Sequence, residues 1–147
     1  MALTEIRAKC RRLKQQHDLK MVVIDYLQLM TSGKRVESRQ QEVSEFSRSL
    51  KLLAKELEVP VIALSQLNRS SEQRTDKRPM VSDLRESGSI EQDADMVLLI
   101  HREDVYDPES PSAGEAQIIV AKHRNGPTGE ITVAFQGAKS RFANMPR

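Results

Sequence analysis

The sequence predicts an α/β fold in which a parallel sheet is flanked by helices and is followed by a C-terminal β-hairpin. Two apolar runs, 20–25 and 61–65, enclose a long stretch with helical periodicity, which predicts a strand, a helix and a second, parallel strand. Both runs lack polar alternation, so we expect strands that are buried on both faces. Near the C-terminus, the turn 125–129 joins two further strand-like segments and predicts the hairpin.

The first helix is expected over residues 3–18, which form a basic amphipathic stretch. Thr4 is the expected N-cap, because its hydroxyl can accept a hydrogen bond from a free amide of the first turn. Ile6, Cys10 and Leu13 have helical spacing and are expected to form the apolar stripe that faces the core.

The second helix is expected to begin at Ser38, because Ser38 and Gln41 have the spacing of a capping box, and to end near Glu58, before Pro60. Its apolar stripe consists of Val43, Phe46, Leu50, Leu53 and Leu57. The later elements are expected in this order: a polar loop at 66–82, a short helical piece at 82–93 that breaks at Gly88, a third buried strand at 96–100, a polar loop at 102–114, and hairpin strands at 116–122 and 130–135.

Length and composition limit the class of protein. The 147 residues are expected to form one incomplete domain, and their single cysteine, which excludes an internal disulfide, fits a reducing cytosol. No apolar run is long enough to cross a bilayer, so we expect a cytoplasmic protein with no membrane partner. The few, scattered aromatic residues argue against a base-stacking platform, so that any nucleic acid would be held by its phosphates.

Asp25 directly follows the first apolar run, at the end of the strand where a parallel sheet places its ligands. A carboxylate buried there is costly unless it is paired, and a hydrated Mg²⁺ is a suitable partner. Asp25 is therefore a candidate for the Walker B aspartate of a nucleotide-hydrolysing core, with a structural aspartate as the alternative. The sequence lacks the Gly-x-x-x-x-Gly-Lys-Ser/Thr loop that would hold the phosphates, since Gly33-Lys34 is followed by Arg35.

Polar side chains also follow the second and third apolar runs. Gln66 comes after the second strand, where an uncharged amide can donate a hydrogen bond to a terminal phosphate and report the nucleotide state to the following loop. The alternative is a loop amide that is satisfied by its own backbone. His101 and Arg102 follow the third strand and are expected at the same edge of the sheet.

Two later segments have residues that suit phosphate groups. The segment 83–95 combines Arg85 with a glycine and free amides where a short helix breaks, although Arg85 and Glu86 also fit a routine surface ion pair. In the hairpin, Lys122 and Arg124 are expected one pleat apart on one strand face, beside the turn. Cations held there can stabilise charge on a phosphoryl group that is transferred in a neighbouring subunit. A solvated hairpin tip is the alternative.

Taken together, four segments resemble the C-terminal motor domain of the DnaB-type replicative DNA helicases, a hexameric RecA-like family. The matching segments are 22–30, 63–69, 83–95 and 122–129, in the order of the family and over nearly the whole chain. The resemblance implies a partial RecA-like parallel sheet flanked by helices, and a parent protein that uses ATP and Mg²⁺ for 5′ to 3′ unwinding. The implied partners are single-stranded DNA, identical subunits in a hexameric ring, primase and a helicase loader.

The same resemblance assigns roles to individual residues. Asp25 matches the Walker B carboxylate, which holds Mg²⁺ through water, and Gln66 matches the sensor of the ATP γ-phosphate. Lys122 and Arg124 match the finger residues that are offered to ATP in the adjacent subunit. The loop that grips the backbone of single-stranded DNA is matched by Arg85, Glu86 and Gly88.

Two interpretations other than a helicase part stay open: a stand-alone binding fragment and another RecA-like ATPase. Since the phosphate loop and the family's activating glutamate are missing from the sequence, the 147 residues are expected to be inactive alone. They could instead act as a stand-alone DNA- or subunit-binding fragment without nucleotide chemistry. Another RecA-like ATPase, such as a recombinase or a circadian-clock ATPase, is a further alternative, against which the turn Lys-His-Arg-Asn-Gly-Pro-Thr-Gly argues.

Overall fold

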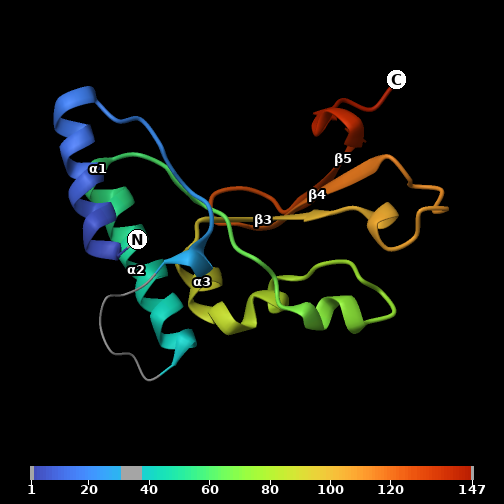
Figure 1. The fold of residues 1–147 in the computed structure, drawn as a ribbon, viewed down its shortest axis with the longest axis horizontal. Coiled ribbons are helices and arrows are strands. Elements are labelled where there is room, and N and C mark those ends of the chain that lie inside the picture. The colour runs from blue at the N-terminus through green and yellow to red at the C-terminus, as the bar shows by residue number, and fades with distance from the viewer. Residues whose placement is uncertain (1, 31–37, 147) are drawn as a thin grey trace. The chain divides into compact units, whose positions relative to one another are not determined.

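The computed structural model describes residues 2–30 and 38–146, with only the course of the backbone at 85–88. The chain forms two compact units. Unit 1 consists of Met1–Arg69 and Ser82–Ala94, and unit 2 consists of Ser70–Val81 and Asp95–Arg147. Helices α1, α2 and α3 belong to unit 1, and strands β3, β4 and β5 belong to unit 2 (Figure 1).

The centre of unit 1 is a pair of parallel strands, as predicted. Strand β1 (Val22–Ile24) pairs with β2 (Val61–Ala63), so that Val22 lies opposite Val61 and Ile24 lies opposite Ala63. The remaining elements of this unit are α1 (Leu3–His17), the 3-10 helix η1 (Leu27–Leu29), α2 (Arg39–Leu57), the 3-10 helix η3 (Val81–Ser87), which starts at the unit boundary, and α3 (Gly88–Asp93). The break expected at Gly88 is therefore the junction of η3 and α3.

Helix α2 supplies most of the core of unit 1. Its expected cap is confirmed, because the Ser38 hydroxyl accepts a hydrogen bond from the Gln41 amide at 3.3 Å. The helix ends at Glu58, which adopts a left-handed conformation with φ 52°. All five residues of the predicted apolar stripe are buried, and Phe46 is fully inaccessible to solvent. Helical periodicity therefore located the core-facing side correctly.

Helix α1 begins earlier than the predicted cap requires. Its N-cap is Ala2, and the Glu5 carboxylate accepts a hydrogen bond from the Ala2 amide at 3.1 Å. Thr4 lies inside the first turn and is exposed, so its prediction as a cap was wrong. The buried side chain of Leu3 belongs to the first turn, so the helix starts at Leu3, before Thr4. Cys10 of the predicted apolar stripe is buried as well, whereas Leu13, the last residue of that stripe, is 43 % exposed.

Helices α1 and α2 lie side by side (Figure 1) and are joined by an ion pair. The Arg11 guanidinium donates to both carboxylate oxygens of Glu56, at 2.6 and 3.0 Å. Hydrogen bonding to Arg11 lowers the pKa of Glu56 below its ordinary value. Since both side chains are exposed, this pair contributes little to stability.

The parallel strands of unit 1 are buried on one face only. Val22, Ile24 and Val61 pack against the helical core, whereas Val23 and Ile62 on the opposite face are 57 % and 47 % exposed. The expectation of two-sided burial was therefore wrong for these strands. An apolar run without alternation shows that both faces of a strand are apolar, but not that both are covered. Here the helices of unit 1 cover only the face that carries Val22, Ile24 and Val61.

Unit 2 contains an antiparallel sheet with the strand order β3-β4-β5-β6. The strands are β3 (Met96–His101), β4 (Glu115–His123), β5 (Gly129–Gln136) and β6 (Arg141–Ala143), and three 3-10 helices, η2 (Arg69–Gln73), η4 (Glu103–Val105) and η5 (Gly137–Lys139), complete the chain. The predicted hairpin is β4 and β5. Strand β3 was expected to be a buried strand of the parallel sheet, but it pairs antiparallel with β4 and its residues alternate between exposed and buried.

Candidate functional site

Asp25 lies at the carboxyl end of β1, where the parallel ladder ends. Two backbone hydrogen bonds frame it, from the Leu64 amide to the Ile24 carbonyl and from the Leu27 amide to the Leu64 carbonyl, both at 2.9 Å. The peptide bond that follows Asp25 is cis. The side chain of Asp25 is exposed, so the prediction of a carboxylate buried beside the strand was wrong. An exposed carboxylate has no desolvation cost to offset and can still hold a hydrated cation.

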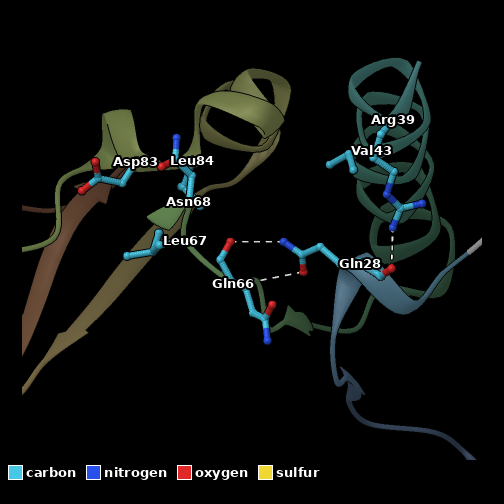
Figure 2. A pocket seen from close by; sticks show the side chains of 8 residues that line it. All are labelled: Gln28, Arg39, Val43, Gln66, Leu67, Asn68, Asp83 and Leu84. Atoms are coloured by element: carbon cyan, nitrogen blue, oxygen red, sulfur yellow. Dashed lines mark hydrogen bonds between the residues drawn. The ribbon is translucent and has the colours of Figure 1, made fainter. Parts of the chain in front are cut away.

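Gln66 lies at the same end of the parallel pair, shortly beyond Ala63, the last residue of β2. Its backbone is held by the side-chain amide of Gln28 on both of its polar groups (Figure 2). The Gln66 amide donates to Gln28 Oε1 at 3.3 Å, and Gln28 Nε2 donates to the Gln66 carbonyl at 3.1 Å. The exposed side chain of Gln66 points away from Gln28, so its amide is available to a ligand beyond the strand ends.

A cavity of about 120 Å³ opens beside these strand ends, entirely within unit 1. It is lined by Gln28, Arg39, Val43, Gln66, Leu67, Asn68, Asp83 and Leu84 (Figure 2). On its far side, the Asn68 amide donates to the Asp83 carbonyl at 3.1 Å, which ties the segment after β2 to the start of η3. The segment that follows Gln66 is therefore bound at both of its ends.

Arg85, Glu86 and Gly88 follow directly in the chain, and their side-chain positions lie outside the described part of the structure. Helix α3, which continues from them, is fastened to α2 by polar contacts. The Ser47 hydroxyl donates to the Asp93 carboxylate at 2.7 Å, and the Ser89 hydroxyl donates to Ser44 Oγ at 2.8 Å. This segment thus has a firm C-terminal anchor on α2.

The two hairpin cations belong to unit 2. Lys122 is a half-buried residue of β4 opposite Val97, and Arg124 is the first turn residue after the end of β4. The Arg124 amide donates to the Asp95 carbonyl at 2.8 Å, and its guanidinium lies 3.2 Å from the Asp95 carboxylate. The prediction that both cations lie on one strand was therefore wrong for Arg124, because β4 ends at His123 and Arg124 belongs to the turn.

His101 and Arg102 belong to unit 2, whereas the parallel strands β1 and β2 belong to unit 1. Both belong to the antiparallel sheet and its following loop, where His101 is buried with Nε2 at 2.9 Å from the Glu103 carboxylate. The Arg102 guanidinium lies 4.0 Å from the centre of the Phe135 ring. Strand β3, which ends at His101, pairs antiparallel with β4, and the expected place of these two residues beside Asp25 stays a prediction.

Within the described residues, no group of three or more His, Cys, Asp or Glu side chains could hold a metal ion. Asp25 alone nevertheless fits Mg²⁺, which keeps several waters and takes one or two carboxylates together with substrate phosphates. Among the described helices, none has the length and apolar character needed to cross a membrane.

The family model of the DnaB-like helicase C-terminal domain matches residues 1–144. This chain belongs to that family. The resemblance seen in the sequence is thereby confirmed, and the similar solved structures bear out the RecA-like α/β fold. One solved ATPase domain is 47 % identical with a TM-score of 0.94, over 99 % of this chain and 52 % of that one. A DnaB-like replicative helicase described together with its interactions with primase gives the same identity and TM-score, over 99 % and 36 %.

Curated DnaB relatives match over almost the whole chain. The replicative DNA helicase DnaB of Leifsonia xyli subsp. xyli is 77 % identical over 99 % of this chain, and that of Geobacillus stearothermophilus is 62 % identical over 99 %. The chain spans 32 % of the length of each of these two relatives.

Sequence reasoning did not assign a role to Gln28 or Arg39 in this DnaB-family site. Gln28 is a lone amide between Leu27 and Leu29, and Arg39 is the first residue of α2. An amide inside an apolar segment is a usable signal, because a half-buried amide needs hydrogen-bond partners. Arg39 has helical spacing with Glu42, with which it pairs, but its hydrogen bonds to backbone carbonyls nine and eleven residues earlier leave no comparable signal.

Proposed function

We propose that this chain is the C-terminal part of the motor domain of a replicative DNA helicase, and that its two units are parts of one incomplete RecA-like domain. One observation carries the proposal: in a chain of the DnaB-like family, the parallel strands β1 and β2 place Asp25 and Gln66 at the same edge. Ligands of parallel sheets bind at that edge. The parent activity is the unwinding of DNA in the 5′ to 3′ direction, driven by ATP.

Each of the two side chains has a distinct task in this proposal. The Asp25 carboxylate accepts hydrogen bonds from waters of a hydrated Mg²⁺, which neutralises phosphate charge when it is bound with ATP. The Gln66 amide donates a hydrogen bond to the γ-phosphate. Loss of that phosphate removes the bond, and the segment from Gln66 to Asn68 then transmits the change towards η3.

The hairpin cations act on a neighbouring copy. Lys122 and Arg124 reach the ATP of the adjacent subunit in a hexameric ring, where a guanidinium stabilises charge that develops on the transferred phosphoryl group. Arg85, Glu86 and Gly88 contact the backbone of single-stranded DNA. Primase and a helicase loader are further partners, and the protein works in the cytoplasm.

The 147 residues alone do not hydrolyse ATP, because their sequence contains no loop that cradles the phosphates. The test compares the whole protein that carries this chain with the 147 residues, as ATP turnover with and without single-stranded DNA. Turnover by the whole protein that Asp25→Asn abolishes, and that the matched control Glu109→Gln leaves intact, supports the proposal. DNA binding without any turnover would favour the stand-alone binding fragment instead.

The DNA contact has its own test. In the whole protein, Arg85→Ala should weaken single-stranded DNA binding equally for all sequences, because phosphate contacts carry no base information. The slope of log affinity against log salt should become shallower by about one unit per lost contact. A loss confined to some sequences, or an unchanged slope, would assign Arg85 to a surface ion pair.

A further inference from the structure

We propose that Gln28 is a positioning residue for Gln66, and that Arg39 holds Gln28 in the required place. This inference rests on the proposed role of Gln66 as the γ-phosphate sensor. It explains how the side chain of Gln66, which lies on an irregular segment beyond β2, is oriented.

The first step is the way in which Gln28 continues the sheet. The backbone ladder between β1 and β2 ends with the hydrogen bonds of Leu64, because the chain after Asp25 turns into η1. The side-chain amide of Gln28 then substitutes for a strand, since one planar group offers both an acceptor to the Gln66 amide and a donor to the Gln66 carbonyl. A further bond, from Gln28 Nε2 to Ser65 Oγ at 3.0 Å, fixes the same amide.

The second step is the support of Gln28 itself. The Arg39 guanidinium donates to the backbone carbonyls of Gln28 and of Met30, the latter at 3.1 Å, and also pairs with the Glu42 carboxylate. It lies over the ring of Phe46, 5.9 Å from the ring centre. Phe46 is fully buried, so this chain of contacts starts in the core of unit 1. Its part from Arg39 through Gln28 to the backbone of Gln66 is drawn in Figure 2.

The third step is the functional consequence. The side chain of Gln66 is exposed and no hydrogen bond fixes it to Gln28, so its direction depends on the backbone that carries it. Errors of about 1 Å in the placement of a catalytic group can cost about 10²-fold in rate. Removal of the Gln28 amide frees both polar backbone groups of Gln66, and the sensor then samples positions in which it misses the phosphate.

The experiment measures DNA-stimulated ATP turnover of the whole protein. Gln28→Ala should lower kcat by about ten- to a hundredfold and leave KM for ATP nearly unchanged. The reason is that the misplaced Gln66 side chain no longer donates its hydrogen bond to the γ-phosphate, and we expect this bond to matter mainly in the transition state. Gln28→Glu has the same size without the amide donors and should be impaired as well. Gln16→Ala, an exposed glutamine of α1, is the matched control and should behave as the wild type.

A double substitution separates positioning from a direct role. In the Gln66→Ala background, Gln28→Ala should have no further effect on kcat, whereas independent roles would give additive losses. Arg39→Ala should resemble Gln28→Ala. Arg39→Lys should not restore activity, because the single nitrogen of an ammonium does not reproduce the two separate guanidinium nitrogens that donate to the Gln28 and Met30 carbonyls. Arg12→Ala, an exposed arginine of α1, serves as its control.

Failure of this inference differs from failure of the proposed function. If Gln66→Ala leaves turnover unchanged, the proposed sensor is wrong. If Gln66→Ala lowers turnover but Gln28→Ala does not, or if the two losses are additive, the positioning role is overturned and the sensor stands. Hydrogen exchange gives a readout that needs no activity: Gln28→Ala should accelerate exchange of the Gln66 amide by about tenfold or more, and an unchanged rate would also overturn the inference.

Discussion

Gln66 in unit 1 and Arg124 in unit 2 are both proposed to meet ATP, but the structure holds them differently. Gln66 is fixed through its backbone, and its side-chain amide points away from the residues that fix it. Arg124 is bound through its backbone and also through its guanidinium, which pairs with Asp95 at 3.2 Å. Gln66 can therefore meet a phosphate without losing a contact, whereas Arg124 must exchange one partner for another.

The exchange at Arg124 is inexpensive. Its side chain and that of Asp95 are 49 % and 59 % exposed, and ion pairs in such surroundings contribute little to stability. The contrast suggests two designs. A sensor is served by a fixed backbone and a side chain that can turn to the ligand, whereas a cation proposed to act between subunits can be held by a weak ion pair that is exchanged when the subunits associate.

The largest expected effect is the loss of ATP turnover when Arg124 is replaced, which tests its proposed role between subunits. In the whole protein, Arg124→Ala should lower ATP turnover by roughly 10³- to 10⁵-fold with a much smaller change in ATP affinity, because the guanidinium acts on transition-state charge. Steady-state turnover and nucleotide binding measure the two quantities. The contact should also act between subunits, so mixing Arg124→Ala with Asp25→Ala subunits should restore some activity. If every mixture stays at the level of the two pure variants while hexamers form, Arg124 belongs to its own subunit's structure.

A second prediction compares the packing of the two units. Phe46→Ala, in the helical core of unit 1, should destabilise the chain by about 3 to 5 kcal/mol because it leaves a cavity in a fully buried position. Phe142→Ala in unit 2 removes a ring that is 48 % exposed, and its effect should be clearly smaller. Urea unfolding followed by circular dichroism checks both. Equal losses would mean that the apolar face of unit 2 contributes as much as the core of α2.

The next prediction concerns the two helix starts. Ser38→Ala should cost about 1 kcal/mol, because it removes the acceptor for the Gln41 amide at the start of α2. Thr4→Ala should cost much less, since Thr4 lies inside the first turn of α1 and does not cap it. Thermal unfolding of the two variants beside the wild type gives the comparison, and a larger loss for Thr4→Ala would restore it as the cap.

The smallest effect is expected at the ion pair between α1 and α2. The pKa of Glu56 is lowered in the folded chain, so the pair adds stability above the ordinary glutamate pKa of 4.5 and loses it as the pH falls through the lowered value. The melting temperature of Glu56→Gln should therefore lie slightly below that of the wild type at pH 7, and the gap should close in acid and in about 1 M salt. Glu109→Gln is the control, and a gap that persists in acid would point to packing instead.

Local physics made part of this fold predictable. The cap at Ser38, the stripe on α2 and the parallel pairing of β1 and β2 all follow from spacing and from the handedness of strand, helix and strand connections. Asp25 and Gln66 share a sheet edge for the same reason. These features depend on residues that are close in sequence or on rules that hold for most chains.

The remaining features depend on partners that are distant in sequence. An apolar run does not specify which strand it will join, so β3 was assigned to the parallel sheet although it pairs with β4. Exposure of Val23 and Ile62 likewise depends on what covers the sheet, which periodicity does not reveal. The role of Arg39 was invisible for a related reason, since backbone carbonyls accept its hydrogen bonds and carry no sequence signature.

The hairpin turn after β4 contains a glycine, Gly126, at which an added side chain would displace the ring of His123. A Cβ atom on Gly126 would lie 2.4 Å from the His123 ring, whose Nδ1 is 3.4 Å from the Pro127 carbonyl oxygen. The imidazole thus fills the space over the turn, and the pyrrolidine ring restricts the residue that follows the glycine. A tip that is restricted in this way has less entropy to lose in the proposed contact with a neighbouring subunit. A substitution at Gly126 would therefore displace the imidazole and loosen the tip while it leaves the charge of the tip unchanged.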